Sequence, residues 1–344
     1  MNRPGPFSPT GVGSLPHPDP DAAARLVLST FSEVPHWPQL PRRSFLENMY
    51  VQYAAGLPAA ELSGDRIFVP GGDLLLAEAE GFYERFLGAD PLSFAIPPDR
   101  AAGLYRLLAL ARGPFAAVKG QVTGPVSFGL MVTDREKKPL FYDPVGRDVL
   151  VKHLLRVAQW QAAQLSRLSP NVILVVDEPY LASVGSAVLS LSRDEVVACL
   201  NEIFDGLSGV LCGVHCCANT DWGLVLSSRA AYLSFDAYEY ADSLLLYPDA
   251  LAEFLSRGGK LAFGIVPTAP DRIAAETAES LAARMEGILA AFERRGIARD
   301  AVVRASFITP ACGLGTLSPR EAETAMGLTA GLSGILRARY GDAA

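Results

Sequence analysis

The chain contains few of the residues that most often bind metals or form disulfides, with five cysteines and four histidines among its 344 residues. Three of the cysteines fall within residues 212–217, a crowding that suits reduced thiols better than a disulfide framework. The first residues, Met1-Asn-Arg-Pro-Gly-Pro-Phe7, contain no apolar core of a secretory signal. We therefore expect a cytoplasmic protein with free thiols.

The chain also has little positive charge. Its 30 lysines and arginines are outnumbered by 37 aspartates and glutamates, which gives a formal net charge of −7. This balance lacks the basic footprint that nucleic acids and anionic membranes attract, so neither partner is expected. No apolar run reaches the roughly 18 residues of a membrane-spanning helix. Half of the residues are hydrophobic and 19% are charged, so the chain can bury a large core.

A further absence concerns glycine-rich sequence. No Gly-X-Gly-X-X-Gly opens a helix after the first expected strand, which disfavours a dinucleotide-binding fold. The chain instead alternates apolar strand-like segments with helical patterns, which is typical of parallel strands. The strand-like segments lie near residues 10–15, 34–40, 115–122, 171–176, 209–217, 231–236, 261–266 and 301–308.

Eight such units predict an α/β fold, a single (β/α)8 TIM barrel over residues 1–344. Breaks in the pattern at 56–97 and 131–146 predict insertions after the second and third strands. A doubly wound open sheet is the alternative.

His215 and Cys217 stand at the end of the fifth expected strand. Because side chains alternate along a strand, both point to one face, while Cys216 points to the other. Cys312 follows the eighth expected strand and offers a second thiol. One imidazole and two thiolates suit zinc, and the lack of closely spaced cysteine pairs favours an open, catalytic site. Burial of the cysteines as ordinary core residues is the alternative.

Other polar residues lie at the carboxyl ends of the expected strands, where barrels place their active sites. They are Ser14, Asp177, Glu178 and Asp236. Asp177 and Glu178 end a strongly apolar strand, where an acidic side chain is costly unless it has a partner. We expect this pair to bind a ligand, with a salt link or a cap on the next segment as the alternative. For Asp236, a fourth metal ligand and a helix cap are both open.

Several short motifs resemble those of the catalytic barrel of cobalamin-independent methionine synthase, and they occur in the same order along the chain. They are Val12-Gly13-Ser14, Thr123-Gly124-Pro125, Asp177-Glu178-Pro179, His215-Cys216-Cys217 and Pro310-Ala311-Cys312-Gly313-Leu314. The same superfamily includes uroporphyrinogen decarboxylase and methylcobamide:thiol methyltransferases. His-X-Cys with a distant Cys-Gly is specific to its thiol-alkylating branch, in which the residues hold catalytic zinc.

The resemblance implies a role for each metal-binding residue. His215, Cys217 and Cys312 would bind zinc. A carboxylate after the next strand, Asp236 or Glu239, would be the fourth ligand.

The resemblance also implies substrate contacts. Asp177, in the same motif as Glu178, would bind the amino group of homocysteine, and Ser14 would hold the carboxylate end. Gln52 stands where the family has a substrate-binding glutamate. The nucleophile would be the zinc-bound thiolate of the substrate, with no separate protein nucleophile.

Departures from the family pattern point away from folate as the methyl donor. The histidine expected after the seventh strand is replaced by the stretch 264–268, and the tryptophan expected after Thr123-Gly124-Pro125 is missing from 126–131. A methyl group on a corrinoid, free or protein-bound, is the expected donor, and methyltetrahydrofolate is less favoured.

The expected function is therefore zinc-dependent transfer of a methyl group to a small thiol, with homocysteine giving methionine as the favoured case. One alternative is transfer from a methylcobamide to another thiol, such as coenzyme M. Two others are a metal-free lyase like uroporphyrinogen decarboxylase and a non-catalytic corrinoid-binding protein. The sequence leaves open the oligomeric state and whether a corrinoid protein docks on the barrel mouth.

Overall fold

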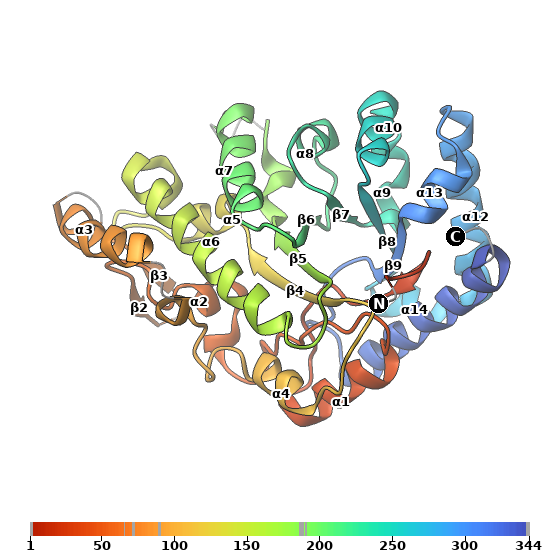
Figure 1. Ribbon diagram of the computed structural model, residues 1–344, viewed down its shortest axis with the longest axis horizontal. Coiled ribbons are helices and arrows are strands. Elements are labelled where there is room, and N and C mark those ends of the chain that lie inside the picture. The colour runs from red at the N-terminus through yellow and green to blue at the C-terminus, as the bar shows by residue number, and fades with distance from the viewer. Residues whose placement is uncertain are drawn as a thin grey trace.

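The computed structural model describes residues 3–341 except 65, 71–72, 89–90, 186–188 and 190. The strands are β1 (Ser8–Pro9), β2 (Glu61–Ser63), β3 (Arg66–Phe68), β4 (Val118–Thr123), β5 (Val172–Asp177), β6 (Leu211–Cys216), β7 (Tyr232–Phe235), β8 (Lys260–Val266) and β9 (Ser306–Pro310). Seven of them form one parallel sheet in the order β1-β9-β8-β7-β6-β5-β4. The sheet curls, and helices surround its outer side (Figure 1).

The helices connect successive strands. They are α1 (Pro20–Thr30), α2 (Met49–Tyr53), α3 (Asp73–Gly88), α4 (Ala102–Leu110), α5 (Pro125–Met131), α6 (Pro144–Leu165), α7 (Arg193–Asp205), α8 (Trp222–Ser227), α9 (Ala237–Leu244), α10 (Pro248–Ser256), α11 (Pro270–Ala275), α12 (Ala278–Arg294), α13 (Arg299–Ala305) and α14 (Pro319–Tyr340). The 3-10 turns are η1 (Phe45–Glu47), η2 (Pro91–Phe94), η3 (Leu140–Tyr142) and η4 (Pro179–Ser183).

Several long helices begin where the sequence supplies a capping side chain. Ser192, Thr277 and Ser318 each precede a helix and accept a hydrogen bond from its third backbone amide in a reciprocal capping box. Such a cap satisfies amide groups that the first helical turn leaves unpaired, and it contributes about 1 kcal/mol.

The parallel sheet and its surrounding helices confirm the predicted α/β class, and the curled parallel sheet is that of a TIM-like barrel.

The second expected strand, 34–40, is not a regular strand in the structure. Prolines at 35 and 38 have no amide hydrogen for a strand ladder. The segment still lies beside two others, because the Trp37 amide donates to the Lys119 carbonyl (3.2 Å) and the Gln39 amide donates to the Gly13 carbonyl (3.1 Å). Residues 34–40 thus link β4 to the chain that follows β1.

The eighth expected strand, 301–308, begins later in the structure than the sequence predicts. Residues Arg299–Ala305 form α13, and β9 starts only at Ser306. The run Ala301-Val302-Val303 is apolar and β-branched, but short apolar runs do not distinguish a strand from a buried helix turn. Val302 and Val303 are buried on the helix.

Two further segments interrupt the alternation of strands and helices. Residues 61–68 form the antiparallel hairpin β2–β3, and α3 packs against α6 at the left edge of the view in Figure 1. Near the second predicted insertion, η3 packs against α5 and α6.

The hydrophobic core has two parts. The larger part fills the space between the sheet and the surrounding helices, and it includes the thiols of Cys212 and Cys216. The smaller part plugs the inside of the curled sheet, where Tyr232 and Phe307 meet with ring centroids 5.5 Å apart. Since burial of one large apolar side chain contributes about 2 kcal/mol, the inner plug stabilises the curl and makes it a packed core rather than a pore.

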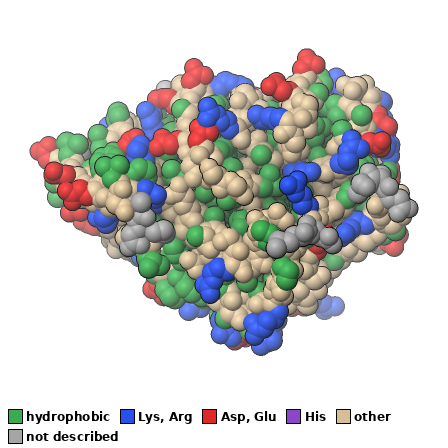
Figure 2. Space-filling model, in the orientation of Figure 1, with side chains coloured by type: hydrophobic (Ala, Val, Ile, Leu, Met, Phe, Trp, Pro, Cys, Tyr) green, Lys and Arg blue, Asp and Glu red, His purple; other side chains and the backbone are tan. Residues whose placement is uncertain are grey.

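The molecular surface carries mixed charge. On the face drawn in Figure 2, lysine and arginine side chains are scattered among acidic ones and do not gather into one basic patch. Among the described residues, no helix combines the length and the hydrophobicity that a membrane span requires.

Candidate metal and thiol site

A cavity of about 430 Å³ opens at the carboxyl ends of the sheet strands. Its wall combines residues at or just after the carboxyl ends of β5 and β6, residues that follow β1, β8 and β9, and residues of the segment 39–49. The lining residues are Val12, Ser14, Gln39, Pro41, Arg42, Glu47, Asn48, Met49, Asp177, Pro179, His215, Cys217, Thr268, Cys312, Gly313, Gly315 and Thr316. Sequence-distant polar groups therefore share one cavity, as the barrel prediction requires.

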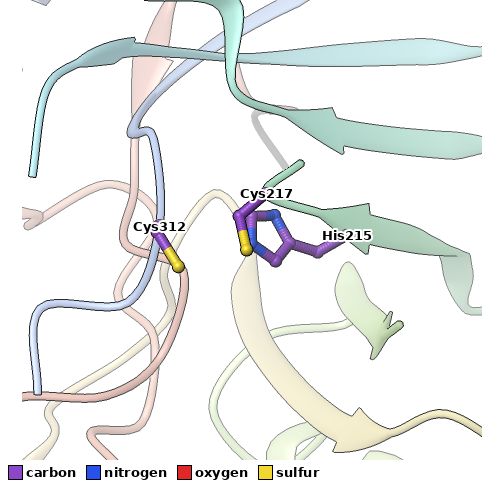
Figure 3. A group of neighbouring side chains, drawn as sticks. All are labelled: His215, Cys217 and Cys312. Atoms are coloured by element: carbon purple, nitrogen blue, oxygen red, sulfur yellow. The ribbon is translucent and has the colours of Figure 1, made fainter. Parts of the chain in front are cut away.

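Three potential metal ligands meet in this cavity. The ligand atoms of His215, Cys217 and Cys312 all lie within 4.8 Å of one another. In Figure 3, His215 and Cys217 project from the end of β6 to the same side, and Cys312 faces them from the loop after β9. The structure thus brings together three of the four metal ligands that the sequence predicts.

A hydrogen bond to Ser234 orients the His215 ring. Its Nδ1 lies 2.9 Å from the Oγ of Ser234 on the neighbouring strand β7, whereas its buried Nε2 has no hydrogen-bond partner. When Nδ1 carries the proton and donates a hydrogen bond to the Ser234 Oγ, Nε2 presents a lone pair to the two thiols. An unpartnered buried acceptor beside two cysteines fits the donor set of a zinc site, in which a second hydrogen bond orients each histidine ligand.

The two thiols influence each other. A hydrogen bond donated by the Cys312 thiol holds the pKa of Cys217 well below its ordinary value. The same hydrogen bond raises the pKa of Cys312. A stabilised thiolate at Cys217 is the protonation state that a metal ligand needs.

The fourth predicted ligand lies outside this cluster. Asp236 is the N-cap of α9, and its Oδ1 accepts a hydrogen bond from the Glu239 amide at 2.9 Å. Burial raises the pKa of Asp236 to about 6. The other carboxylate considered, Glu239, forms an ion pair with Arg272. Of the two roles left open for Asp236, the structure displays the cap.

Asp177 is the acidic side chain best placed for a ligand. It ends β5, pairs in register with His215, and has a buried Oδ1 without a partner. Burial raises its pKa to about 6, against the attraction of the His215 and Lys119 side chains. An unpaired carboxylate oxygen in a cavity is available to a hydrogen-bond donor from a substrate.

Ser14 lies opposite, against the loop that carries Cys312. Its Oγ accepts a hydrogen bond from the Gly315 amide at 3.2 Å, and the Leu314 amide donates to its carbonyl oxygen at 2.9 Å. Gly313 permits this approach, because a Cβ there would lie 2.3 Å from the Ser14 Oγ. The first and last parts of the chain therefore form one wall of the cavity.

The remaining two predicted substrate ligands do not line the cavity. The Glu178 carboxylate accepts hydrogen bonds from the Val126 amide (2.9 Å) and from the amide (2.8 Å) and hydroxyl (2.6 Å) of Ser127. Burial raises the pKa of Glu178 to about 7. Gln52 is buried behind Gln39, whose Nε2 donates to its Oε1 at 2.8 Å. Glu178 thus contacts α5, and Gln52 reaches the cavity only through Gln39.

One polar residue of the interior was missed in the sequence. Lys119 is fully buried on β4, where its Nζ donates to the Val12 carbonyl at 2.5 Å. Burial lowers its pKa to about 8, opposed by the attraction of Asp177. The signal was a lysine inside the apolar run 115–122, a place where a charged side chain is costly unless it has partners.

Among known proteins, the chain is similar to solved structures, whereas comparisons of sequence find no relative. No model of a known protein family matches the chain, and no curated protein matches it either. A B12-independent methionine synthase from a Shewanella species, solved in complex with selenomethionine, is similar with a TM-score of 0.63 and 17% identity. The match covers 98% of this chain and 99% of that one.

Two other solved structures are similar over nearly their whole lengths. A putative B12-independent methionine synthase from Listeria monocytogenes has a TM-score of 0.59 at 12% identity, covering 97% of this chain and 99% of that one. A methyltransferase from Methanosarcina mazei has a TM-score of 0.55 at 15% identity, covering 95% and 93%. The chain therefore has the fold shared by B12-independent methionine synthase-like proteins and a methanogen methyltransferase, and the resemblance predicted from its motifs is confirmed at the level of the fold.

Proposed function

We propose that this protein is a zinc-dependent S-methyltransferase that moves a methyl group to a small thiol, with homocysteine as the favoured acceptor. One observation carries the proposal. An imidazole and two thiols from strands far apart in the sequence converge within 4.8 Å in a cavity that also contains an unpaired carboxylate oxygen. Similarity of fold alone would not specify this chemistry, because one fold supports many functions.

His215, Cys217 and Cys312 would hold the zinc ion, with Asp236 as the better fourth ligand because Glu239 is paired with Arg272. A zinc ion at this position would supply a deprotonated, nucleophilic substrate thiol at neutral pH, where a free thiol is mostly protonated. The Asp236 Oδ1 accepts the capping hydrogen bond, so Oδ2 would be the oxygen offered to the metal, and a carboxylate is the hardest ligand of this set and the one suited to leave when substrate sulfur enters.

The protein side chains would hold the rest of the substrate. The free Oδ1 of Asp177 would accept a hydrogen bond from the amino group of homocysteine, and Ser14 would contact its carboxylate end. Val12 and Met49 line the same cavity and offer apolar surface to the methylene groups. This arrangement would fix the sulfur beside His215 and Cys217 while leaving one side open to a donor.

The donor would approach from the cavity mouth. Methyl transfer to sulfur forms one S–C bond and breaks the bond of methyl to its carrier, whose electron pair stays with the carrier. A methylcorrinoid is the favoured carrier, because the folate-specific tryptophan and histidine expected in 126–131 and 264–268 are missing. The Gly264–Thr268 stretch still contributes Thr268 to the cavity wall.

The decisive test is metal content, measured by elemental analysis on protein purified without a metal-binding tag. We expect about one zinc per chain in the wild type and in Cys199→Ala, and a large loss in Cys312→Ser, as for removal of one of few protein ligands. Cys199 is a matched control because its thiol is buried on α7, outside the cluster. A wild type that takes up no zinc under reducing conditions would refute the proposal and favour a metal-free lyase.

The acceptor thiol can be identified through Asp177. With Asp177→Asn, the dissociation constant of homocysteine should rise roughly tenfold, as expected when a charge-assisted hydrogen bond is lost. A small thiol without an amine, such as coenzyme M, should bind equally well to both proteins, and zinc content should stay unchanged. Equal loss for both thiols would contradict the role of Asp177 as amine ligand.

A further inference from the structure

A second cavity, of about 390 Å³, adjoins the thiol cavity. Asn48 lines both cavities and caps α2, its Oδ1 accepting a hydrogen bond from the Tyr50 amide at 3.0 Å. Met49 lines the first cavity, whereas Tyr50 and Val51 line the second. One short helix therefore separates the two spaces, and a ligand lying across it could occupy both.

The second cavity is apolar and positively charged. Its apolar wall includes Val51, Ile67 and Leu130, and its charged residues are Arg66 and Lys137. None of its described lining residues is acidic, although the whole chain has a net charge of −7. Such a wall suits a ligand that has both a flat apolar body and an anion.

Two exposed cations, Arg66 and Lys137, line the second cavity. Within the described part of the chain, neither Arg66 nor Lys137 has an ion-pair partner, whereas the nearby Arg135 pairs with Glu61 at 2.6 Å. Both side chains are exposed, so an anion can reach them without rearrangement of the core.

The loop presents Lys137 in an unusual conformation. Lys137 has a φ of 67°, which side chains other than glycine adopt at a cost of about 1 kcal/mol. Asp134 maintains the turn, since its Oδ1 accepts hydrogen bonds from the amides of Glu136 (2.9 Å) and Lys138 (2.8 Å). Backbone strain held in this way is common at ligand-binding positions.

We propose that the second cavity binds the anionic tail of the methyl donor, specifically the phosphodiester of a corrinoid nucleotide tail. The inference rests on the proposed function. A cavity of about 430 Å³ that holds a thiol has no room for a corrin ring, so the ring must lie over its mouth and extend beyond it. The tail would then reach Arg66 and Lys137 beyond the shared wall at Asn48, and these cations would bind the phosphodiester.

Binding measurements test this without any methyl transfer. Equilibrium dialysis, read by corrinoid absorbance, would compare methylcobalamin with methylcobinamide, which has the same ring but no nucleotide or phosphodiester. We expect the wild type to bind methylcobalamin roughly tenfold more tightly, the effect of charge-assisted contacts to one anion. The preference should vanish in Arg66→Ala/Lys137→Ala and weaken with added salt.

Arg135→Ala is the matched control. It removes an exposed cation from the same loop, but that cation is paired with Glu61 and does not line the second cavity. The preference for methylcobalamin should persist in this variant. Equal binding of both corrinoids by the wild type, or a preference that survives in the double variant, would overturn the inference.

Two further measurements separate this inference from the proposed function. Cys312→Ser should lose zinc but keep the corrinoid preference, because Cys312 is not part of the second cavity. A wild type that holds zinc and binds homocysteine without any corrinoid preference would retain the proposed function and refute the phosphodiester site. Tighter binding of methyltetrahydrofolate triglutamate than monoglutamate, dependent on Arg66 and Lys137, would refute the corrinoid source and assign the cavity to a folate tail.

Discussion

His153 lies in the middle of α6, where it is fully buried and its Nε2 is 2.8 Å from the Tyr53 carbonyl oxygen. Burial lowers its pKa from 6.5 to about 4, and the charge of Arg85 acts in the same direction. A histidine whose folded pKa is depressed stabilises the fold above its unfolded pKa. That contribution is lost as the pH falls from about 6.5 towards 4, because the unfolded chain binds the proton first.

This linkage gives a prediction for acid stability. Between pH 7 and pH 5, His153 alone should reduce the free energy of unfolding by about 2 kcal/mol, following the proton linkage relation. In His153→Gln, the loss of stability over this interval should be smaller by the same amount. Urea unfolding of both proteins at the two pH values measures the difference. An identical pH dependence in the two proteins would contradict the assignment.

The burial of His153 also shows which residue-level properties the sequence did not provide. Its charged neighbours Lys152 and Arg156 are typical of a surface position, but α6 is covered by other elements on several sides and His153 is buried. The orientation of His215 and Cys217 was predictable, because alternation along a strand is a local rule. The partners of Lys119 and Glu178 were not, because they come from segments far away in the chain.

At the scale of elements, Glu178 connects the end of β5 to the start of α5. Gly124 is required at this junction, since a Cβ there would lie 2.2 Å from the carboxyl group of Glu178. The carboxylate satisfies amides that the first turn of α5 leaves unpaired. A residue expected to contact substrate therefore has a structural anchor role in this arrangement.

A double-mutant cycle tests the anchor. Glu178→Ala should lower the free energy of unfolding by about 2–3 kcal/mol, because buried donors lose a charged acceptor. Gly124→Ala should also destabilise, but much less in the Glu178→Ala background, where the clashing carboxyl group is gone. Chemical denaturation of the four proteins gives the coupling. Additive effects would show that the two residues do not contact each other.

Element types were predictable where pattern and length agreed. Helices such as α6 and α14 are long and begin directly after a capping side chain, Asp143 and Ser318, followed by proline, which is a pattern that sequence alone can show. The boundary between α13 and β9 was not, because Val302 and Val303 fit a buried helix turn as well as a strand.

At the scale of the whole molecule, the three candidate metal ligands connect β6 to the loop after β9, across the intervening strands β7 and β8. A metal bound there would link distant parts of the sheet in the folded state only. Any ligand that binds only the folded state stabilises it by mass action, by about 2.7 kcal/mol at 100 times its dissociation constant.

Thermal unfolding should therefore depend on the metal. Addition of a strong zinc chelator should lower the melting temperature of the wild type and of Cys199→Ala. It should leave Cys312→Ser unchanged, because that variant already lacks the link. Differential scanning calorimetry with and without chelator measures the shift. An equal effect of the chelator on Cys312→Ser would place the stabilising metal elsewhere.

The class of the molecule was predictable because alternating strands and helices favour a parallel sheet enclosed by helices. The number of regular strands was not. Residues 34–40 depend on hydrogen bonds to Gly13 on one side and Lys119 on the other, and proline limits how many they can make. The second cavity could not be predicted from the sequence either, since Arg66 and Lys137 are far apart in the chain and line one cavity only after folding.

The separation of the ligands has a consequence for synthesis on the ribosome. His215 and Cys217 are translated long before Cys312, which follows 95 residues after Cys217. Until β9 joins β8, a nascent chain presents only two of the three candidate donors, and it would hold a metal ion less tightly than the folded chain. Metal occupancy would thus distinguish chains that have completed the sheet from those that have not.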